Sequence, residues 1–232
     1  MAATVAFAFA LFGLLLVGAG FLLGSRFGHT REQALKDSLD ERDQKLTLVE
    51  HELLRHSAVD PATGVHTQQH FQEFLEREWR RAARERKWVS AIMVEVDHFR
   101  GFAERQGRTA GEACLKSVAE TLKPLVHRAS DVIARYGGTG KFGIVLGSTD
   151  AKGALLLAER LRTAVEQLKT PNPVAPLKIV TVTLGVASAM PDRDGAWQEI
   201  ELIAAAERAL TRAREQGRNT IASDTPAAPV RS

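Results

Sequence analysis

Two short patterns in the sequence place side chains at spacings that phosphate and metal sites use. Gly138-Thr-Gly-Lys141 resembles the end of a phosphate-binding loop, but Arg135 stands where that motif needs its first glycine, and Phe142 replaces the serine or threonine. His66 and His70 stand four residues apart, without the further ligands that a metal site requires. We interpret the first pattern as a turn and the second as the solvent-facing start of a helix.

A third pattern, Arg128-Ala-Ser-Asp131, holds a cation and an acid three residues apart. A guanidinium fork matches phosphate oxygens and stacks on guanine, and a carboxylate accepts hydrogen bonds from the edge of the base. The same four residues also suit an exposed turn before a strand, so the pattern alone leaves both interpretations open.

Alternating helical and strand patterns would position these side chains. We predict helices over residues 68–86, 110–125, 151–168 and 197–216, and strands over 89–96, 132–136, 142–146 and 179–187. The glycine-rich segment between the second and third strands predicts a hairpin. The alternation predicts an α+β domain with a mixed central sheet flanked by helices.

The first 24 residues carry no charged side chain. As a helix, residues 2–23 would be roughly 33 Å long, enough to cross the hydrocarbon core of a bilayer. Arg26, Arg31 and Lys36 follow this segment and no basic side chain precedes it, so the positive-inside rule places the later residues in the cytoplasm. We predict a single-pass anchor of the inner membrane at residues 1–24. A cleavable signal peptide, the alternative, would need a preceding basic residue and a shorter apolar segment.

Residues 25–57 predict a helical linker. Apolar side chains recur there at heptad spacing, with Arg42 in one core position, at Leu35, Leu39, Leu46, Val49 and Leu53. The spacing indicates a short coiled coil and a homodimer formed through it. The alternative is a single solvated helix with ion pairs such as Glu41 to Lys45. At the other end, residues 223–232 predict a disordered tail.

The composition limits the number of domains and the class of partner. The chain has 232 residues, 44% of them hydrophobic and 25% charged, so one medium domain with a packed core fits beside the accessory segments. The net charge is +3, and basic residues are interleaved with acidic ones. Because a surface for nucleic acid would be more one-sided, we expect no nucleic-acid partner.

Six segments, in order and at matching spacing, resemble the GGDEF (diguanylate cyclase) domain. They are Asp60-Pro-Ala-Thr-Gly-Val65, Val94-Glu-Val-Asp-His-Phe-Arg100, Arg135-Tyr-Gly-Gly138, Phe142-Gly-Ile-Val-Leu146, Val182-Thr-Leu-Gly-Val-Ala187 and Gly217-Arg-Asn219. They are similar to the family's D-x-L-T-G-L opening, its D-x-D-x-F-K strand end, both sides of its signature turn, its V-S-I-G-V-A strand and its closing G-R-N. The resemblance covers residues 58–222 and implies a nucleotidyl-cyclase-like fold there.

The resemblance implies the condensation of two GTP molecules into cyclic di-GMP by a dimer, with Mg²⁺ held by carboxylates. The family takes one carboxylate from the position of Glu95 and another from the signature turn. That turn reads Gly137-Gly138-Thr139-Gly140-Lys141-Phe142, is one residue longer than the family's, and holds no carboxylate. Lys141 would add positive charge where the metal lies. We therefore expect no catalytic residue, no metal and no cofactor, with Glu95 and Mg²⁺ relevant only if the chain is an active cyclase.

The positions that bind GTP in the family are also altered. Ala103 and Glu112 stand where the family has the asparagine and the aspartate that recognise guanine. Arg214 and Arg218 match the two cations that bind the GTP phosphates. Both arginines equally suit an interaction with the dipole at the end of a helix.

The resemblance gives a second role to Arg128 and Asp131. In the family an R-x-x-D motif before the signature turn binds cyclic di-GMP as a product, with a further arginine that Arg160 matches here. The leading hypothesis is a membrane-anchored, inactive GGDEF domain that binds cyclic di-GMP or a protein partner, such as another GGDEF or EAL signalling protein. The alternatives are an active diguanylate cyclase with an unusual turn and a scaffold that binds no nucleotide.

Overall fold

The computed structural model describes residues 42, 45, 57–192 and 198–225. A compact unit begins at Ala58 and contains all of the helices and strands that are given bounds below. The predicted anchor and nearly all of the predicted coiled coil lie outside the described residues. Within the described ranges, no helix has the length and apolar character needed to cross a membrane.

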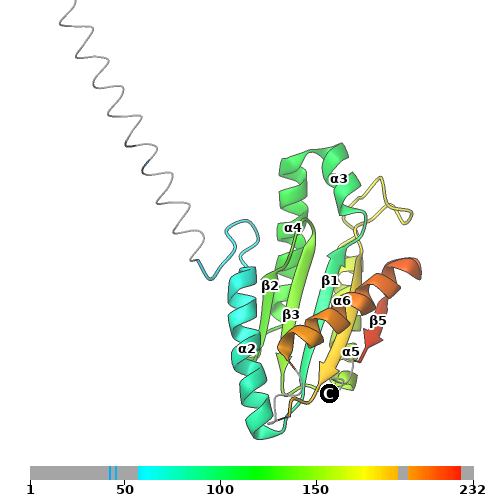
Figure 1. Ribbon diagram of the computed structural model, residues 1–232. Coiled ribbons are helices and arrows are strands. Elements are labelled where there is room, and N and C mark those ends of the chain that lie inside the picture. The colour runs from blue at the N-terminus through cyan, green and yellow to red at the C-terminus, as the bar shows by residue number, and fades with distance from the viewer. Residues whose placement is uncertain (1–41, 43–44, 46–56, 193–197, 226–232) are drawn as a thin grey trace, which may run out of the picture. The chain divides into compact units, whose positions relative to one another are not determined.

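A five-stranded mixed sheet forms the middle of this unit (Figure 1). Its strands are β1 (Val89–Val96), β2 (Asp131–Arg135), β3 (Lys141–Gly147), β4 (Val182–Ala189) and β5 (Ile221–Asp224), in the order β2-β3-β1-β4-β5. Strand β1 runs antiparallel to both of its neighbours, β2 and β3 form a hairpin, and β5 runs parallel to β4. The predicted α+β class and mixed sheet are confirmed.

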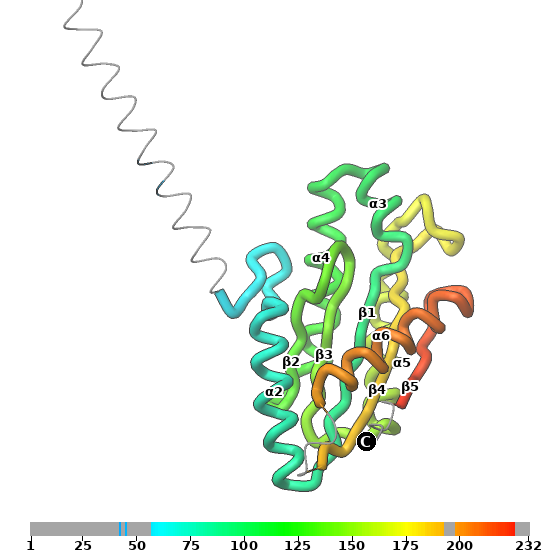
Figure 2. The backbone as a smooth tube through the Cα atoms, viewed as in Figure 1, coloured from blue at the N-terminus to red at the C-terminus, as the bar shows by residue number. Residues whose placement is uncertain are grey.

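Helices cover both faces of the sheet (Figure 2). They are α2 (Gln68–Glu85), α3 (Phe99–Gln106), α4 (Arg108–Leu122) with a 3₁₀ turn at Lys123–Leu125, α5 (Ala151–Gln167) and α6 (Glu199–Glu215). Successive side chains of a strand point to opposite faces. Accordingly, Ile92 and Val94 pack with α4 and α5, whereas Ala91 and Met93 pack with α2 and α6.

Close packing of α6 on the sheet requires Gly185 in β4. A Cβ atom there would lie 2.2 Å from the carbonyl oxygen of Ala206 and 2.2 Å from the amide nitrogen of Leu210. Backbone atoms cannot yield as a flexible side chain can, so any larger residue at Gly185 would push α6 away from the sheet. This contact brings the middle of α6 close to the backbone of β4.

The segment around His66, just before α2, lies along the outer edge of β2. The His66 amide donates to the carbonyl of Ile133 (3.0 Å), and the Arg135 amide donates to the carbonyl of His66 (2.8 Å). A turn precedes this segment, in which the Thr63 hydroxyl and amide both donate to Asp60 Oδ1 (2.5 and 3.0 Å). The isolated bridge between His66 and Ala134 covers part of the outer edge of β2.

Two elements were not predicted, and some element boundaries differ from the predictions. Helix α3 was not predicted, and β4 begins at Val182 rather than at residue 179. Strand β5 was also not predicted, and it includes Ser223 and Asp224, which were assigned to the disordered tail. Arg208 and Arg212 of α6 both contact Asp224, so tertiary contacts define this last strand.

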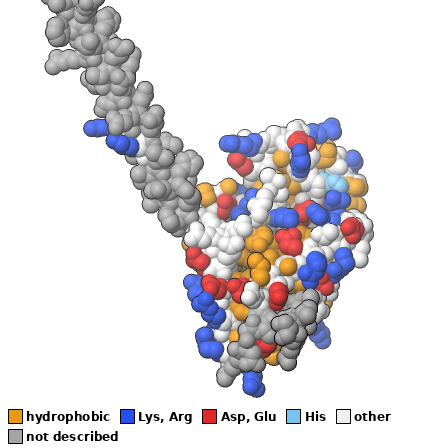
Figure 3. All heavy atoms as spheres, in the orientation of Figure 1, with side chains coloured by type: hydrophobic (Ala, Val, Ile, Leu, Met, Phe, Trp, Pro, Cys, Tyr) orange, Lys and Arg blue, Asp and Glu red, His pale blue; other side chains and the backbone are white. Residues whose placement is uncertain are grey.

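Basic and acidic side chains are interspersed on the face of the molecule that Figure 3 shows. Some charged side chains of the domain form helical ion pairs, such as Arg100 with Glu104 (2.9 Å) and Arg108 with Glu112 (3.3 Å). Exposed pairs of this kind contribute little to stability, about 0.3–0.5 kcal/mol each.

Candidate functional site

The end of β1 holds the first candidate site. Glu95 pairs in register with Lys141 of β3 on one side and with Thr183 of β4 on the other. Its carboxylate lies 3.3 Å from Nη1 of Arg214 and 3.9 Å from Nζ of Lys141. Lys141 also lies 3.2 Å from Oε2 of Glu207. We call these four side chains, Glu95, Lys141, Glu207 and Arg214, the strand-end cluster.

The strand-end cluster is internally neutral, since it contains two acids and two cations. The side chain of Glu95 is only 18% exposed, so its pairing with Lys141 and Arg214 is partly shielded from water. A divalent cation needs several oxygen ligands. The one predicted ligand here, Glu95, instead faces the ammonium group of Lys141 and the guanidinium group of Arg214. The residues of the strand-end cluster therefore do not fit Mg²⁺. Elsewhere in the described ranges, no three His, Cys, Asp or Glu side chains are placed to hold a metal ion.

The signature turn supports this arrangement through its backbone. Gly137 and Gly140 have positive φ angles (61° and 86°), which favour glycine. The carbonyl of Gly140 accepts from the Val96 amide (2.9 Å), and a Cβ atom at Gly140 would lie only 3.0 Å from the Phe99 ring. The turn is thus packed onto the end of β1, and it directs Lys141 toward Glu95.

Asp97, two residues after Glu95, is a buried structural acid that the sequence analysis did not single out. Its carboxylate accepts from the hydroxyls of Thr181 (2.7 Å) and Thr183 (2.6 Å) and from the amide of Asn219 (3.1 Å). Only 1% of the residue is exposed. Asp97 therefore fastens the closing Gly-Arg-Asn segment to β1 and β4.

The other positions that match the GTP-binding residues of the family offer few groups that could contact a ligand. Ala103 packs against the core beside Gly111 of α4, and Glu112 is exposed and paired with Arg108. Arg218 is exposed and lies three residues after the end of α6, with φ of 65°. Of the predicted remnant residues, Glu95 and Arg214 contact each other, whereas Arg218 makes no hydrogen bond or ion pair with either of them in the described part of the chain.

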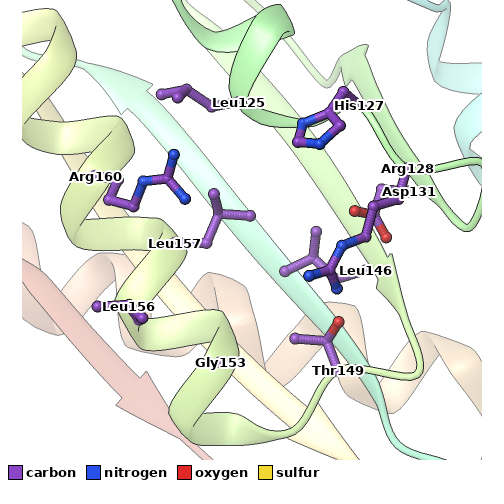
Figure 4. Close-up of a pocket in the computed structure, with 10 residues that line it drawn as sticks. All are labelled: Leu125, His127, Arg128, Asp131, Leu146, Thr149, Gly153, Leu156, Leu157 and Arg160. Atoms are coloured by element: carbon purple, nitrogen blue, oxygen red, sulfur yellow. The ribbon is translucent and has the colours of Figure 1, made fainter.

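A second candidate site lies beside β2. Arg128, Asp131 and Arg160 line one pocket of about 190 Å³ (Figure 4). These three residues were predicted from the sequence, and the structure brings them together. The remaining lining residues, which were not predicted, are Leu125, His127, Leu146, Thr149, Gly153, Leu156 and Leu157.

Three elements build this pocket. Arg128 lies in the turn before β2, and its carbonyl accepts from the amide of Asp131 (2.9 Å). Asp131 begins β2 and pairs with Leu146 of β3. Arg160 comes from α5, and Figure 4 shows its guanidinium and that of Arg128 projecting into the same space from opposite sides. Leucine side chains form the apolar part of the lining.

The two pocket arginines are available to a ligand. In the part of the chain that the structure describes, neither Arg128 nor Arg160 forms a salt bridge. Arg162, two residues further along α5, contrasts with them. Its guanidinium contacts Glu159 (2.6 Å), Glu166 (2.9 Å) and the side-chain oxygen of Asn219 (3.0 Å).

Burial raises the pKa of Asp131, and a hydrogen bond from Ser130 (3.2 Å) together with the charge of Arg128 partly offsets the increase. The pocket therefore combines one partly buried acid with two free guanidinium groups on an apolar lining. Such a set is suited to a ligand with anionic groups and a polar aromatic ring.

Comparison with known proteins decides the family. The family model described as "Diguanylate cyclase, GGDEF domain" matches residues 57–220 of this chain. The chain belongs to the GGDEF family. Active members of this family use Mg²⁺, whereas both carboxylates of the strand-end cluster are already paired with Lys141 or Arg214.

Relatives of known description agree with this assignment. The chain is 32% identical over 133 residues to diguanylate cyclase A of Treponema denticola, covering 57% of this chain and 34% of the relative. It is 31% identical over 164 residues to the probable diguanylate cyclase DgcT of Escherichia coli, covering 70% and 34%. The chain spans about a third of the length of these relatives.

Solved structures share the fold. The coiled coil and GGDEF domain of DgcB from Caulobacter crescentus, in complex with c-di-GMP, superimposes with a TM-score of 0.65 at 23% identity, covering 83% of this chain and 98% of that one. The FimX GGDEF domain from Pseudomonas aeruginosa has a TM-score of 0.63 at 18% identity, covering 72% and 99%.

Proposed function

We propose that this chain is a membrane-anchored GGDEF protein that is catalytically inactive and binds cyclic di-GMP in the pocket lined by Arg128, Asp131 and Arg160. One observation carries the proposal. The three side chains meet in one pocket, and among the described residues neither guanidinium group forms a salt bridge. The GGDEF domain of DgcB, which has the same fold, was solved in complex with c-di-GMP.

The chemistry of the pocket suits one half of cyclic di-GMP. Arg128 and Arg160 offer charge-assisted hydrogen bonds to phosphate, and Asp131 accepts from the edge of guanine. At about 190 Å³ the pocket is smaller than the roughly 300–1,000 Å³ of sites that enclose a whole ligand, so part of the dinucleotide stays outside. Each charge-assisted contact contributes about 1.5–3 kcal/mol, which supports an affinity that is roughly micromolar.

Two features of the strand-end cluster support the absence of catalysis. Joining a 3′-hydroxyl to an α-phosphate requires a cation that neutralises charge and activates the hydroxyl. Here Lys141 and Arg214 already neutralise Glu95, and the turn supplies no second carboxylate. In addition, the methyl group of Ala103 offers no hydrogen bond to guanine.

A titration of the full-length protein in detergent tests the binding proposal. Cyclic di-GMP should bind the wild type at micromolar concentration, and Arg128→Ala should weaken binding at least about tenfold. Arg108→Ala, which removes an exposed arginine outside the pocket, is the matched control and should bind as the wild type does. Equal affinity of the wild type and Arg128→Ala would favour a scaffold that binds no nucleotide in this pocket.

An assay with GTP and Mg²⁺ or Mn²⁺ tests the inactivity. The full-length protein should form no cyclic di-GMP above a control without enzyme. Replacing Thr139-Gly140-Lys141 by Asp-Glu should not fully restore turnover, because Ala103 remains. Robust product formation by the unmodified protein would establish the active cyclase instead.

The membrane anchor and the dimer belong to the same proposal. The apolar segment at residues 1–24 and the heptad spacing in residues 25–57 support them. A reporter enzyme that works only in the cytoplasm, fused after Ser232, should be active, and the protein should sediment with membranes. A shortened, exported form of the protein would contradict this topology.

A further inference from the structure

His127 is a pocket residue that the family resemblance did not single out. It directly precedes Arg128 in the turn before β2, and it is exposed to solvent. Its ring lines the same pocket as Arg128, Asp131 and Arg160 (Figure 4). The imidazole therefore belongs to the same pocket lining as the two guanidinium groups.

The pocket has few groups that titrate. The charged or titratable side chains among its lining residues are His127 and Arg128 from the turn, Asp131 from β2 and Arg160 from α5. Both guanidinium groups stay charged at any physiological pH, and Asp131 is the single acid among the lining residues. His127 lies close enough to Asp131 to lower the pKa of that carboxyl, against the larger effect of burial.

We propose that His127 is a third cationic contact for the bound phosphate, so that this GGDEF protein holds cyclic di-GMP more tightly in mildly acidic conditions than in mildly alkaline ones. The inference rests on the proposed function, and it adds a regulation of the same pocket. The reason is electrostatic. Imidazoles gain a proton in the range between pH 5 and 8, whereas a phosphodiester keeps its charge there.

Protonation of Asp131 at lower pH would have the opposite effect on the affinity for cyclic di-GMP. Burial raises the pKa of its carboxyl, and protonation would remove the acceptor for the guanine edge. The effect of His127 is therefore measured between pH 5.5 and 7.5. Asp131→Asn, which does not titrate, shows how much of any slope belongs to the carboxyl.

Substitutions separate the charge of His127 from its ring. His127→Phe keeps an aromatic face for stacking and removes the charge, and His127→Lys keeps a charge at every pH of the experiment. The wild type should bind cyclic di-GMP about three- to tenfold more tightly at pH 5.5 than at pH 7.5. His127→Phe should bind with a flat pH profile at the weaker level, and His127→Lys with a flat profile near the tighter level. Thermal unfolding of each variant checks its fold.

The outcomes distinguish the two proposals. Binding by the wild type that depends on Arg128, with the same pH slope in the wild type and His127→Phe, would overturn the role of His127 and leave the proposed function standing. Absence of binding by the wild type at both pH values, or binding that ignores Arg128→Ala, would overturn both. A slope that disappears in both His127 variants supports the inference.

Discussion

The strand-end cluster and the pocket beside β2 both contain acidic and basic side chains, but the basic side chains have different partners in the two regions. In the strand-end cluster, each cation has an acidic partner within the protein, as Lys141 has Glu207 at 3.2 Å. In the pocket, Arg128 and Arg160 have no salt bridge within the described residues. A cation whose charge is neutralised internally has little left to offer a ligand. The comparison teaches that the partners of a residue, and not its type alone, decide whether it is available for binding.

The two regions should respond differently to mutation. Removing one member of a partly buried group leaves the other members without partners, and the fold becomes less stable. Removing a free, exposed guanidinium leaves nothing unpaired, so binding should change and stability should not. The predictions below test this division, beginning with the largest effect.

Asp97→Ala should lower the free energy of unfolding by about 2–4 kcal/mol, because two hydroxyls and the amide of Asn219 lose their buried acceptor. Urea denaturation measures the change. Glu104→Ala, which removes an exposed acid of α3, is the control and should cost less than about 0.5 kcal/mol. A cost for Asp97→Ala as small as that of the control would contradict its structural role.

Substitutions of Arg160 and Arg162 on α5 should have opposite patterns of effect, one on ligand binding and the other on stability. Arg160→Ala should weaken binding of cyclic di-GMP about tenfold and leave stability unchanged within about 0.5 kcal/mol. Arg162→Ala should leave binding unchanged and lower the free energy of unfolding by about 1 kcal/mol, because Glu159, Glu166 and Asn219 lose their shared donor. Calorimetry and denaturation of both variants check this. A loss of affinity confined to Arg162→Ala would reverse the assignment.

Lys141→Met should have a smaller effect. It removes the cation between Glu95 and Glu207, and Arg214 still contacts Glu95. We expect a loss of about 0.5–1 kcal/mol in the free energy of unfolding and no change in cyclic di-GMP binding. Denaturation with a parallel titration measures both. A changed affinity would mean that the two regions are coupled.

Asp131→Asn should give the smallest change in stability, an increase of a few tenths of a kcal/mol at pH 7. Burial raises the folded pKa of this carboxyl above its unfolded value, so the folded state is favoured at low pH. That advantage is lost as the pH rises from the unfolded pKa to the folded one. The gain of the asparagine variant should therefore vanish below pH 4, and its affinity for cyclic di-GMP should fall. A variant less stable than the wild type at pH 7 would contradict this sign.

Strong local patterns made much of the fold predictable. Strand β1 matches the predicted Val89–Val96 because its mostly apolar run lies between the charged residues Lys87 and Asp97, and the hairpin follows from a glycine-rich turn between two short apolar runs. Helix α3 was missed because its eight residues bury only Phe99 and Phe102, too few to show a helical period. Strand β5 has no strand-like pattern, since its pairing with β4 and the contacts of Asp224 define it.

The residues of the candidate sites also differ in how far they could be predicted from the sequence. The Arg128–Asp131 motif could be recognised because its residues are close in the sequence, and Arg160 followed from the resemblance to the family. The resemblance placed the charge of Lys141 near the metal position of Glu95, but the register that pairs the two residues and the contact of Lys141 with Glu207 depend on the packing of β1, β3 and α6. The contacts of Asp97 and the position of His127 in the pocket likewise depend on tertiary packing.

The most direct test of the account is calorimetric titration of the full-length protein with cyclic di-GMP, performed with and without GTP and Mg²⁺. The account predicts roughly micromolar binding in both cases, with equal affinity, because the free arginines of the pocket bind the ligand and the neutralised strand-end cluster does not engage GTP and Mg²⁺. Absence of heat at high micromolar ligand, or a GTP-dependent change in affinity with formation of product, would contradict it.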